Sequence, residues 1–377
     1  MERTEIAIVG GGAIGCATAY YLAKEGADVT LIESSGIAGA ASGFAMGLLS
    51  PLSGAGIPGP LEELCRQGFF MHREMAGELR DATGVDYHAE PRDSIYLAST
   101  EQEAKALGVL ARYSQSIDGV TTQWVDTRAV LDMEPRVSPE VHGGLLVRGT
   151  WILEAYDYTM ALSRAAELGG VKVTYGKVRG LKRALSGCQV LMDVDAVEAK
   201  KVVLAMGPWM SLAQRWLGMT IPIYPLKGQI LRVDLPGGPM RCTIHDENGN
   251  YAGSKPDGLV WAGTTEEQVG FDDEPTQAAR ARILREVSAF LPAIKEANVV
   301  KQTACLRPVS TDGLPIIGEA PGWKGVYLCT GAGRKGIILS PSMGLATAEL
   351  VMKGQSRFAL DMFSPARFAS TSPTAHR

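Results

Sequence analysis

The sequence is poor in the features that mark several broad classes of protein. Its six cysteines are scattered and none lies in a C-x-x-C pair, which argues against a disulfide framework or a structural zinc site. No block of lysine and arginine stands out, and the net charge of −4 provides no positive field for nucleic acid or anionic lipid. We therefore expect no nucleic-acid partner and no metal, and the scattered cysteines favour a reducing, cytoplasmic compartment.

The sequence also lacks a segment suited to crossing or entering a membrane. Residues 36–60 carry no charge, but they contain too many glycines and prolines for a spanning helix. An uncharged loop that lies against a buried ligand explains this segment better than an exposed loop, which would carry more charge. The first expected strand begins at Ile6, so close to Met1 that we expect no signal peptide.

The segment from Ile6 to Glu33 has the order of a dinucleotide-binding βαβ unit. An apolar strand leads into a glycine turn, an alanine-rich helix follows, and a second strand ends at an acid. Gly10 permits the tight turn, Gly12 lets the backbone approach a pyrophosphate, and Gly15 lets the helix pack closely on the sheet. The phosphates are expected at the helix N-terminus, where unpaired N–H groups favour negative charge. Glu33 is placed to accept hydrogen bonds from a ribose, but the motif does not separate FAD from NAD.

The rest of the chain alternates between helix–strand units and strand-rich segments. Helical spacing predicts helices over 61–83, 101–116, 157–168, 277–290 and 341–352. Apolar runs predict strands over 94–98, 141–147, 171–175, 201–205, 224–233, 258–263, 299–306 and 325–329. We expect an α/β fold in which an antiparallel β-rich substrate domain of α+β character is inserted into a Rossmann-like nucleotide-binding domain. The predicted limits are 1–85, 149–221 and 299–363 for the nucleotide-binding domain, 86–148 and 222–298 for the substrate domain, and 364–377 for a flexible tail.

Five stretches of the chain carry a likeness to a known family. They are the N-terminal βαβ unit, Ala41–Pro51, Leu204–Trp209, Pro225–Gln229, and a C-terminal block that covers Leu306–Gly318 and Gly331–Pro341. With these stretches the sequence resembles, over nearly its whole length, the D-amino acid oxidase superfamily of flavoenzymes, and in particular its glycine oxidase and sarcosine oxidase branches. The resemblance implies bound FAD in the Rossmann-like domain and oxidation of an amine or amino acid to an imine.

The resemblance also implies which positions contact the FAD. They lie in the glycine turn and its helix, at the ends of neighbouring strands, in the uncharged loop and in the C-terminal block. These positions are Gly10, Gly12, Ala13, Ile14, Gly15, Glu33, Ser34, Ala41, Ser42, Gly43, Met46, Gly47, Leu48, Val178, Ala205, Gly207, Trp209, Gly228, Cys305, Arg307, Gly331, Gly333, Arg334, Lys335, Gly336 and Ile337.

Four residues are expected to form the substrate site. Arg307 stands where glycine oxidases bind the substrate carboxylate, and a guanidinium suits this role because it holds a carboxylate through two parallel hydrogen bonds. The alternative is a structural arginine paired with a nearby acid. Arg334 is either a second cation of the site or a loop-stabilising residue, and Tyr251 either meets the carboxylate or belongs to the core. Thr265 replaces a methionine of glycine oxidases, which suggests a substrate different from, or larger than, glycine.

The resemblance implies that the substrate loses a hydride to flavin N5 and that the imine then hydrolyses to a keto acid and ammonia or an amine. No histidine and no pair of acids marks itself as a general base, so we expect the five histidines to be ordinary side chains. Dioxygen or another electron acceptor would reoxidise the flavin, and the sequence does not decide between an oxidase and a dehydrogenase.

Cys305 departs from glycine oxidases, which have glycine at this position and bind FAD without a covalent bond. Its spacing to Asp312 matches the flavin-attaching cysteine of the sarcosine oxidase branch, but Arg307 and Pro308 replace the residues found there. A small buried side chain is therefore favoured over a covalent link to the flavin.

Two other interpretations of the function stay open from the sequence. Thr265 and Cys305 favour a secondary amine or an opine-like N-substituted amino acid as an alternative substrate. The chain can also be the flavin subunit of a larger complex, and a homo-oligomer is compatible with the sequence. An NAD-dependent dehydrogenase would leave the segment from Arg307 to Pro341 without explanation.

Overall fold

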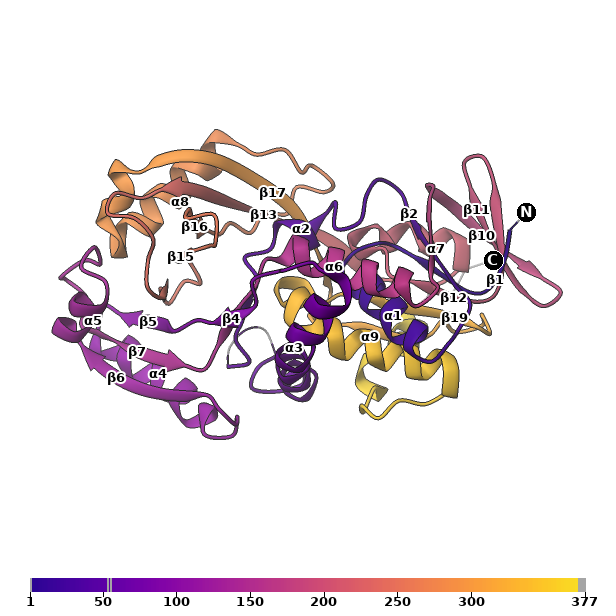
Figure 1. The fold of residues 1–377 in the computed structure, drawn as a ribbon, viewed down its shortest axis with the longest axis horizontal. Coiled ribbons are helices and arrows are strands. Elements are labelled where there is room, and N and C mark those ends of the chain that lie inside the picture. The colour runs from indigo at the N-terminus through magenta and orange to yellow at the C-terminus, as the bar shows by residue number, and fades with distance from the viewer. Residues whose placement is uncertain (1, 53, 55, 372–377) are drawn as a thin grey trace.

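The computed structural model describes residues 2–371 apart from residues 53 and 55, and the chain forms two lobes along its long axis (Figure 1). One lobe contains both ends of the described part of the chain, and the other lies at the far end of the long axis. A small sheet connects the two, with the strands β3 (Leu48–Leu49), β8 (Trp151–Ile152) and β4 (Glu90–Pro91). No helix in the described part of the chain is both long enough and apolar enough to cross a membrane.

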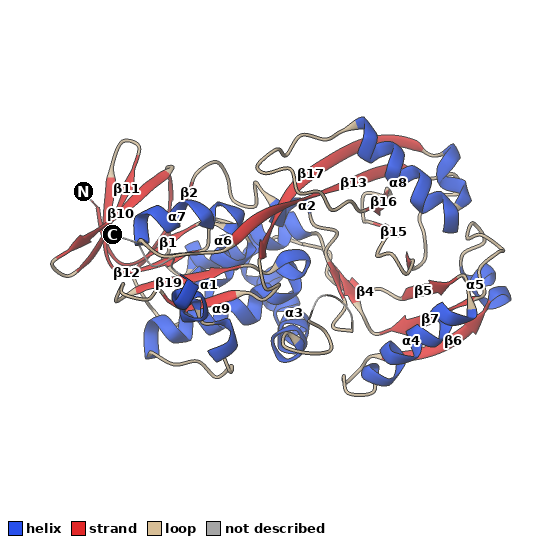
Figure 2. Ribbon diagram, turned by 180° about the vertical axis from the view of Figure 1, so that it is seen from behind, coloured by secondary structure: helices blue, strands red, loops and turns tan. Residues whose placement is uncertain are grey.

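The first lobe is built on an eight-stranded sheet with a parallel centre (Figure 2). The main path is β10–β11–β12–β1–β2–β9, while β19 pairs with β12 and β18 with β19. The pairs β12–β1, β1–β2, β2–β9 and β12–β19 are parallel. The strand bounds are β1 Glu2–Val9, β2 Val29–Glu33, β9 Lys172–Tyr175, β10 Val178–Ala184, β11 Gly187–Met192, β12 Ala196–Leu204, β18 Ile316–Glu319 and β19 Val326–Thr330.

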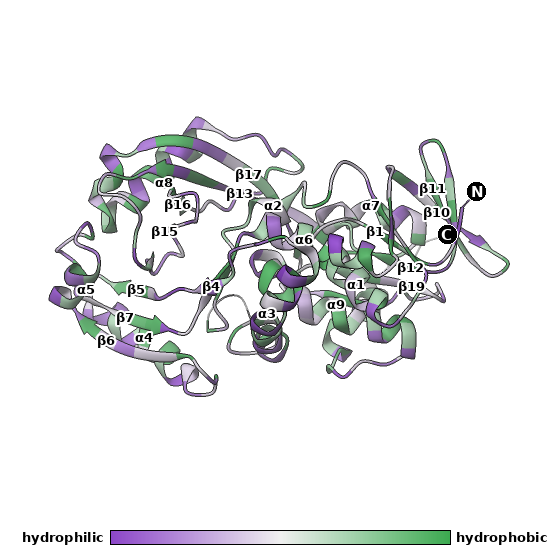
Figure 3. Ribbon diagram, viewed as in Figure 1, coloured by the Kyte–Doolittle hydropathy of each residue, from purple (hydrophilic) through white to green (hydrophobic). Residues whose placement is uncertain are grey.

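Helices cover both faces of this sheet because its strands are apolar on both sides. Ile6 and Ile8 of β1 face a core that includes α1 and α9, whereas Ala7 and Val9 face a second core that includes α7. The colouring in Figure 3 shows this concentration of hydrophobic residues in α1, α9 and the strands beside them. The helix bounds in this lobe are α1 Ala13–Lys24, α2 Ala41–Phe44, α3 Glu62–Thr83, α6 Ala155–Leu168, α7 Met210–Leu217 and α9 Gly336–Lys353.

The last helix begins at Gly336 rather than near Pro341, as the sequence had suggested. Pro341 lies inside the helix, and because it has no N–H group it leaves the carbonyl of Ile337 without its usual partner. Two side chains replace the missing donor, since His72 Nε2 lies 2.8 Å from this oxygen and Ser340 Oγ lies 2.7 Å from it. The buried imidazole of His72 thus has a structural role, and burial lowers its pKa to about 4.

The second lobe contains another eight-stranded sheet, in the order β17–β13–β16–β15–β14–β5–β7–β6. Helices α4 and α5 pack beside β5, β6 and β7, and α8 packs beside β13 and β16. The bounds are β5 Ser94–Ala98, β6 Thr121–Asp126, β7 Gly143–Arg148, β13 Ile223–Asp234, β14 Thr243–His245, β15 Tyr251–Ser254, β16 Val260–Gly263, β17 Asn298–Ser310, α4 Glu101–Ser114, α5 Thr127–Met133 and α8 Gln277–Phe290.

One pair in this sheet differs from the predicted antiparallel arrangement. Strand β5 runs parallel to β14, with Ile95 opposite Ile244, while the other pairs are antiparallel. The two inserted segments each form their own antiparallel group, and they meet edge to edge at this pair. Hydrophobic alternation fixes which face of a strand is buried but says nothing of its direction, so the sequence could not indicate this parallel contact.

Most of the predicted helices and strands are confirmed, with shifts at their ends, but two boundaries differ. Strand β17 pairs with β13 from Asn298 to Ser310, so it belongs to the second sheet and not to the nucleotide-binding segment that was expected from residue 299. The expected flexible tail also begins too early, because Pro365–Thr371 form a 3-10 helix. Arg367 fixes this segment through an ion pair of 2.8 Å with Asp312. Residues 372–377 of the predicted tail lie outside the described residues.

Candidate active site

The N-terminus of α1 forms the cradle that the glycine motif predicts for a pyrophosphate. Gly10 has a φ of +114°, and a Cβ atom there would lie 2.4 Å from the Ala205 carbonyl oxygen. A Cβ atom on Gly15 would lie 1.9 Å from the Gly10 carbonyl oxygen, so helix and strand touch as expected. The first turn of α1 carries no acidic residue, and its Ala13 N–H donates to Ser42 Oγ over 2.9 Å. A positive helix end bordered by small residues fits a dinucleotide phosphate.

Glu33 is held in place by the backbone around the same turn. Its Oε2 accepts from the Gly11 N–H at 2.6 Å, and its Oε1 accepts from the N–H groups of Ser34 at 2.7 Å and Ser35 at 2.9 Å. A carboxylate oxygen has two lone pairs, so Oε2 keeps capacity for a further donor such as a ribose hydroxyl. The geometry therefore fits the predicted role of this acid at the end of β2.

The predicted FAD-contacting loop at Met46 and Gly47 is fixed from the second lobe by a buried lysine. Lys255 Nζ donates to the carbonyl oxygens of Met46 at 2.9 Å and Leu153 at 2.6 Å, and pairs with Glu154 at 2.8 Å. Its side chain is 1% exposed, and burial lowers the pKa of Lys255 while Glu154 counteracts this shift. Gly47 has a φ of +76°, and a Cβ atom there would lie 2.0 Å from the Leu153 carbonyl oxygen. Sequence reasoning missed Lys255, because a single lysine next to a turn gives no signal.

Arg307, the predicted carboxylate ligand, lies on β17 and is 9% exposed. Its Nη2 donates to Thr264 Oγ1 at 2.8 Å, and its Nη1 donates to the Thr265 carbonyl oxygen at 3.1 Å. Its guanidinium lies directly on Gly228 of β13, where a Cβ atom would come within 2.0 Å of Nη2. No acidic side chain pairs with Arg307 within the described residues, so the acid-paired structural arginine is not what the structure shows. A buried cation without a counter-charge is a site for an anionic ligand.

Tyr251 and Arg334 lie near this guanidinium but differ in their surroundings. Burial raises the pKa of the Tyr251 hydroxyl to about 12, although the positive charges of Arg307 and Arg334 oppose the rise. Tyr251 therefore keeps its proton at neutral pH, and its hydroxyl can donate a hydrogen bond to a carboxylate oxygen. Arg334 is half-exposed, pairs with Glu266 at 3.3 Å and donates to the Gly249 carbonyl oxygen at 3.2 Å.

Thr265 contributes to the site through its backbone. Its carbonyl oxygen accepts from Arg307, whereas its hydroxyl donates to the Glu267 carboxylate and accepts from the Gln229 N–H at 3.1 Å. Gln229 Nε2 also donates to Glu267 at 2.9 Å, which closes a small buried network. The Thr265 hydroxyl is thus committed to the protein and not free for a substrate.

Cys305 lies two residues before Arg307 on β17, so both side chains point to the same face of the strand. Burial raises the pKa of the Cys305 thiol, and Arg307 only partly counteracts the rise. A thiol that resists ionisation is a poor nucleophile, which agrees with the predicted role of a small buried side chain.

The C-terminal block brings the remaining predicted FAD positions to the start of α9. The 3-10 helix Gly333–Lys335 leads directly into α9 at Gly336. Lys335 Nζ donates to the Ser50 carbonyl oxygen at 3.2 Å, and so connects this block to the uncharged loop. Of the other predicted positions, Val178 is buried at the start of β10, and Trp209 is partly exposed beside Phe271.

His245 is a buried residue near the site that sequence reasoning did not select. Its ring stacks on Tyr96, with 4.6 Å between ring centroids, and it pairs with Tyr251 across the β14–β15 ladder. Burial, and secondarily the positive charges of Lys335 and Arg334, lower its pKa to about 3. Its Nε2 has no hydrogen-bond partner among the residues that the structure describes. A histidine in an apolar strand is usually a core residue, so the sequence contained no signal for it.

A polar cleft adjoins Arg307 through Thr264. It has a volume of about 550 Å³ and lies between α8 and the turn that joins β14 to β15. Its two cations are each paired with an acid that also lines it, Arg334 with Glu266 and Arg282 with Glu286. The lining residues are Asp246, Asn248, Gly249, Asn250, Thr264, Glu266, Arg282, Glu286, Ala289 and Arg334.

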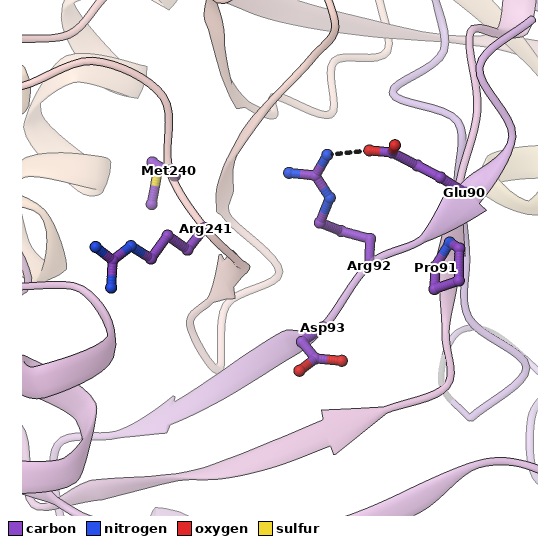
Figure 4. A pocket seen from close by; sticks show the side chains of 6 residues that line it. All are labelled: Glu90, Pro91, Arg92, Asp93, Met240 and Arg241. Carbon is purple, nitrogen blue, oxygen red and sulfur yellow. Dashed lines mark hydrogen bonds and ion pairs between the residues drawn. The ribbon is translucent and has the colours of Figure 1, made fainter.

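A second, more open groove lies beside β4 (Figure 4). Arg92 and Glu90 form an ion pair in it, and Arg241 contributes a third charged side chain. Asp93, Met240 and Pro91 complete its lining. None of the predicted site residues lines this groove, whereas Arg334 lines the cleft that adjoins Arg307.

The chain is similar in sequence to known flavoenzymes over most of its length. A family model described as DAO, FAD dependent oxidoreductase, matches residues 5–350. The glycine oxidase of Geobacillus kaustophilus (strain HTA426) is 32% identical to this chain, over 97% of each protein. The glycine oxidase of Bacillus subtilis (strain 168) is 28% identical, over 92% of this chain and 93% of that protein.

Solved structures give the same result for the fold. The crystal structure of glycine oxidase from Geobacillus kaustophilus superimposes with a TM-score of 0.91 at 31% identity, and covers 97% of this chain and 98% of that one. The iminodiacetate oxidase of Chelativorans sp. BNC1 has a TM-score of 0.89 over 96% of this chain and 99% of that one. At 22% identity this second likeness concerns the fold alone.

Proposed function

The chain belongs to the FAD-dependent oxidoreductase family, and from this premise we propose that it oxidises a carboxylate-bearing amine, such as an amino acid, to the corresponding imine. The observation that carries the proposal is Arg307, a buried guanidinium with no acidic partner in the described part of the chain. The glycine oxidase relatives support an amino acid as the substrate class. The imine then hydrolyses in water to a keto acid and ammonia, or an amine if the substrate is N-substituted.

Arg307 binds and orients the substrate carboxylate. Within the described part of the chain, only two of its five N–H donors are used, on Thr264 and Thr265, so donors remain for a carboxylate. Hydrogen bonds to charged groups contribute about 1.5–3 kcal/mol each, which is enough to fix the position of a small substrate. Tyr251 keeps its proton at neutral pH and supplies a further donor for the carboxylate.

FAD, when bound, supplies the redox chemistry by accepting the hydride that the substrate Cα–H loses. The protein holds the dinucleotide through the cradle around Gly10, Gly15 and Glu33, and Lys255 fixes the Met46 loop beside it. No side chain is needed as a base to remove the hydrogen from the substrate Cα, because this hydrogen leaves as a hydride. The substrate amine gives up its own proton to solvent before that step. The buried thiol of Cys305 supports a flavin held without a covalent bond.

Dioxygen is the expected electron acceptor of the reduced flavin, since the relatives that support the substrate class are named oxidases.

The compartment and the division into domains belong to the same proposal. Six free, buried cysteines support a cytoplasmic location. The two sheets support a division into an FAD-binding and a substrate domain, with β17 assigned to the second.

The proposal is tested by an anaerobic screen of the purified holoprotein. Glycine, N-methylglycine, alanine and proline are compared with methylamine and dimethylamine, which lack the carboxylate. We expect the carboxylate-bearing amines to bleach the flavin absorbance and, in air, to yield hydrogen peroxide. Reduction by the simple amines but not by their carboxylated counterparts would contradict the proposal, as would a flavin that no amine reduces.

A further inference from the structure

The ion pair between Arg334 and Glu266 has a consequence for which substrates this site accepts. Arg334 Nη1 lies 3.3 Å from Glu266 Oε1, and both side chains are 45% exposed. Arg307, by contrast, is almost fully buried and has no acid beside it among the residues that the structure covers. The two cations near the predicted carboxylate position are thus unequal, because one is free and the other is neutralised.

Both guanidinium groups face the same small region. Thr264 lines the cleft that contains Arg334 and Glu266, and its Oγ1 accepts the hydrogen bond from Arg307 Nη2 at 2.8 Å. The positive charges of Arg307 and Arg334 both act on the Tyr251 hydroxyl and hold its pKa lower than burial alone would make it. A substrate whose carboxylate binds Arg307 and which extends past Thr264 would therefore reach the Arg334–Glu266 pair.

Among the described residues that line the cleft, no cation is left without an acidic partner for a second acidic group on the substrate. Arg282 is paired with Glu286 at 2.8 Å, so both cations in the lining have an acidic partner there. Asp246 adds a third carboxylate, which Asn250 holds through two hydrogen bonds of 2.8 Å. With two arginines and three acids, the lining has a formal surplus of one negative charge if all are ionised.

We propose that Glu266 is a specificity-determining residue, which neutralises Arg334 and so restricts the site to amines with a single carboxylate. The inference rests on the proposed function, since it assumes that Arg307 binds the substrate carboxylate. Removal of the Glu266 charge leaves Arg334 unpaired beside the cleft. A second carboxylate on the ligand then gains a cationic partner, and a dicarboxylate binds better relative to a monocarboxylate of the same length.

The experiment measures binding of two unreactive ligands, butyrate and succinate, to the holoprotein by calorimetry. In Glu266→Gln, we expect the preference for succinate over butyrate to rise by about two- to five-fold, the size expected for an exposed ion pair. The gain should shrink in high salt, where charges are screened over a few ångströms. Glu198→Gln is the matched control, because it removes a carboxylate that pairs with an arginine over the same 3.3 Å but lies on β12, outside the cleft. It should leave the preference unchanged.

A second variant tests the same idea from the other partner. In Arg334→Gln, the Glu266 carboxylate becomes unpaired and repels a second ligand carboxylate, so the preference for succinate should fall below that of the parent. An unchanged preference in Glu266→Gln, an equal shift in Glu198→Gln, or a rise in Arg334→Gln would overturn the inference.

Arg307→Gln separates this inference from the proposed function. If Arg307 is the carboxylate ligand, this variant weakens the binding of both butyrate and succinate. If both ligands bind Arg307→Gln as tightly as the parent, the carboxylate clamp itself is wrong. A loss of binding in Arg307→Gln together with an unchanged preference in Glu266→Gln overturns the role of Glu266 alone.

Discussion

Replacement of Gly228 by alanine should displace Arg307 without changing any charge in the site. A Cβ atom on Gly228 would lie 2.0 Å from Arg307 Nη2 and 2.2 Å from its Cζ, so the guanidinium cannot stay where it is. Gly228 lies in the strand β13 opposite Cys305, and its backbone conformation is one that alanine also adopts. Because the obstructed group is the end of a flexible side chain, the fold can accommodate the change.

The effects on binding and on stability should therefore differ. Displacement breaks the hydrogen bonds of Arg307 to Thr264 and Thr265 and misaligns its remaining donors. If about 2–3 kcal/mol of charge-assisted hydrogen bonding is lost, the Kd for a monocarboxylate rises about 30- to 150-fold. Stability should fall by less, because a glycine-to-alanine change gains about 0.4–1 kcal/mol through the unfolded chain, which offsets part of the cost of the two broken hydrogen bonds.

The assay combines calorimetry with butyrate, flavin absorbance and thermal denaturation. Gly180→Ala in β10 is the matched control, since the nearest atom to its Cβ would lie at an ordinary 3.8 Å, and it should leave the Kd unchanged. A Kd for Gly228→Ala close to that of the parent would refute the argument that Arg307 in its observed position binds the carboxylate. Loss of the fold in Gly228→Ala would contradict the claim that the guanidinium can move aside.

Three further predictions follow from other parts of the structure. A Cβ atom at position 10 would lie 2.4 Å from the Ala205 carbonyl oxygen, and the backbone there has a φ of +114°. Gly10→Ala should therefore bind much less FAD than the parent protein. A full complement of flavin in this variant would contradict the role of the turn as a pyrophosphate cradle. Burial raises the pKa of the Cys305 thiol and so disfavours the thiolate that would attack the flavin. Acid precipitation should therefore release the yellow flavin into the supernatant. A yellow pellet would show a covalent link. Burial lowers the pKa of His72 to about 4 and that of His245 to about 3, both below the usual 6.5. Between these values the unfolded chain binds more protons than the folded chain. The free energy of unfolding should therefore fall as the pH drops from 6.5 towards 4. In His245→Phe this fall in Tm should be smaller by a few degrees, and an equally steep fall would contradict the role of the neutral imidazole.

The sequence predicted the nucleotide-binding half of the molecule well because its signals are local. The turn at Gly10, the close contact at Gly15 and the acid at Glu33 lie within one βαβ unit, where spacing determines geometry. The resemblance to a known family then supplied Arg307, whose burial and lack of an acidic partner in the described chain agree with the role expected of it.

The features that the sequence did not indicate depend on contacts between distant segments. Lys255 fixes the Met46 loop from another sheet, and Glu266 meets Arg334 although 67 positions separate them in the chain. The parallel pairing of β5 with β14 likewise joins two separate insertions. Local patterns of hydrophobicity carry no information on such partners. Thr265 is the opposite case, in which the sequence suggested a role that the structure does not support. Its replacement of a methionine suggested a contact with the substrate, but its hydroxyl bonds to Gln229 and Glu267 of the protein.

We propose that a bound flavin and the Arg307 guanidinium together select an amine that carries a carboxylate. The most direct test is the anaerobic rate of flavin reduction in the parent and in Arg307→Gln, with N-methylglycine compared with dimethylamine. We predict that the parent reacts much faster with N-methylglycine, and that Arg307→Gln keeps its FAD but loses this preference. A variant that retains both its flavin and the preference of the parent would contradict the account.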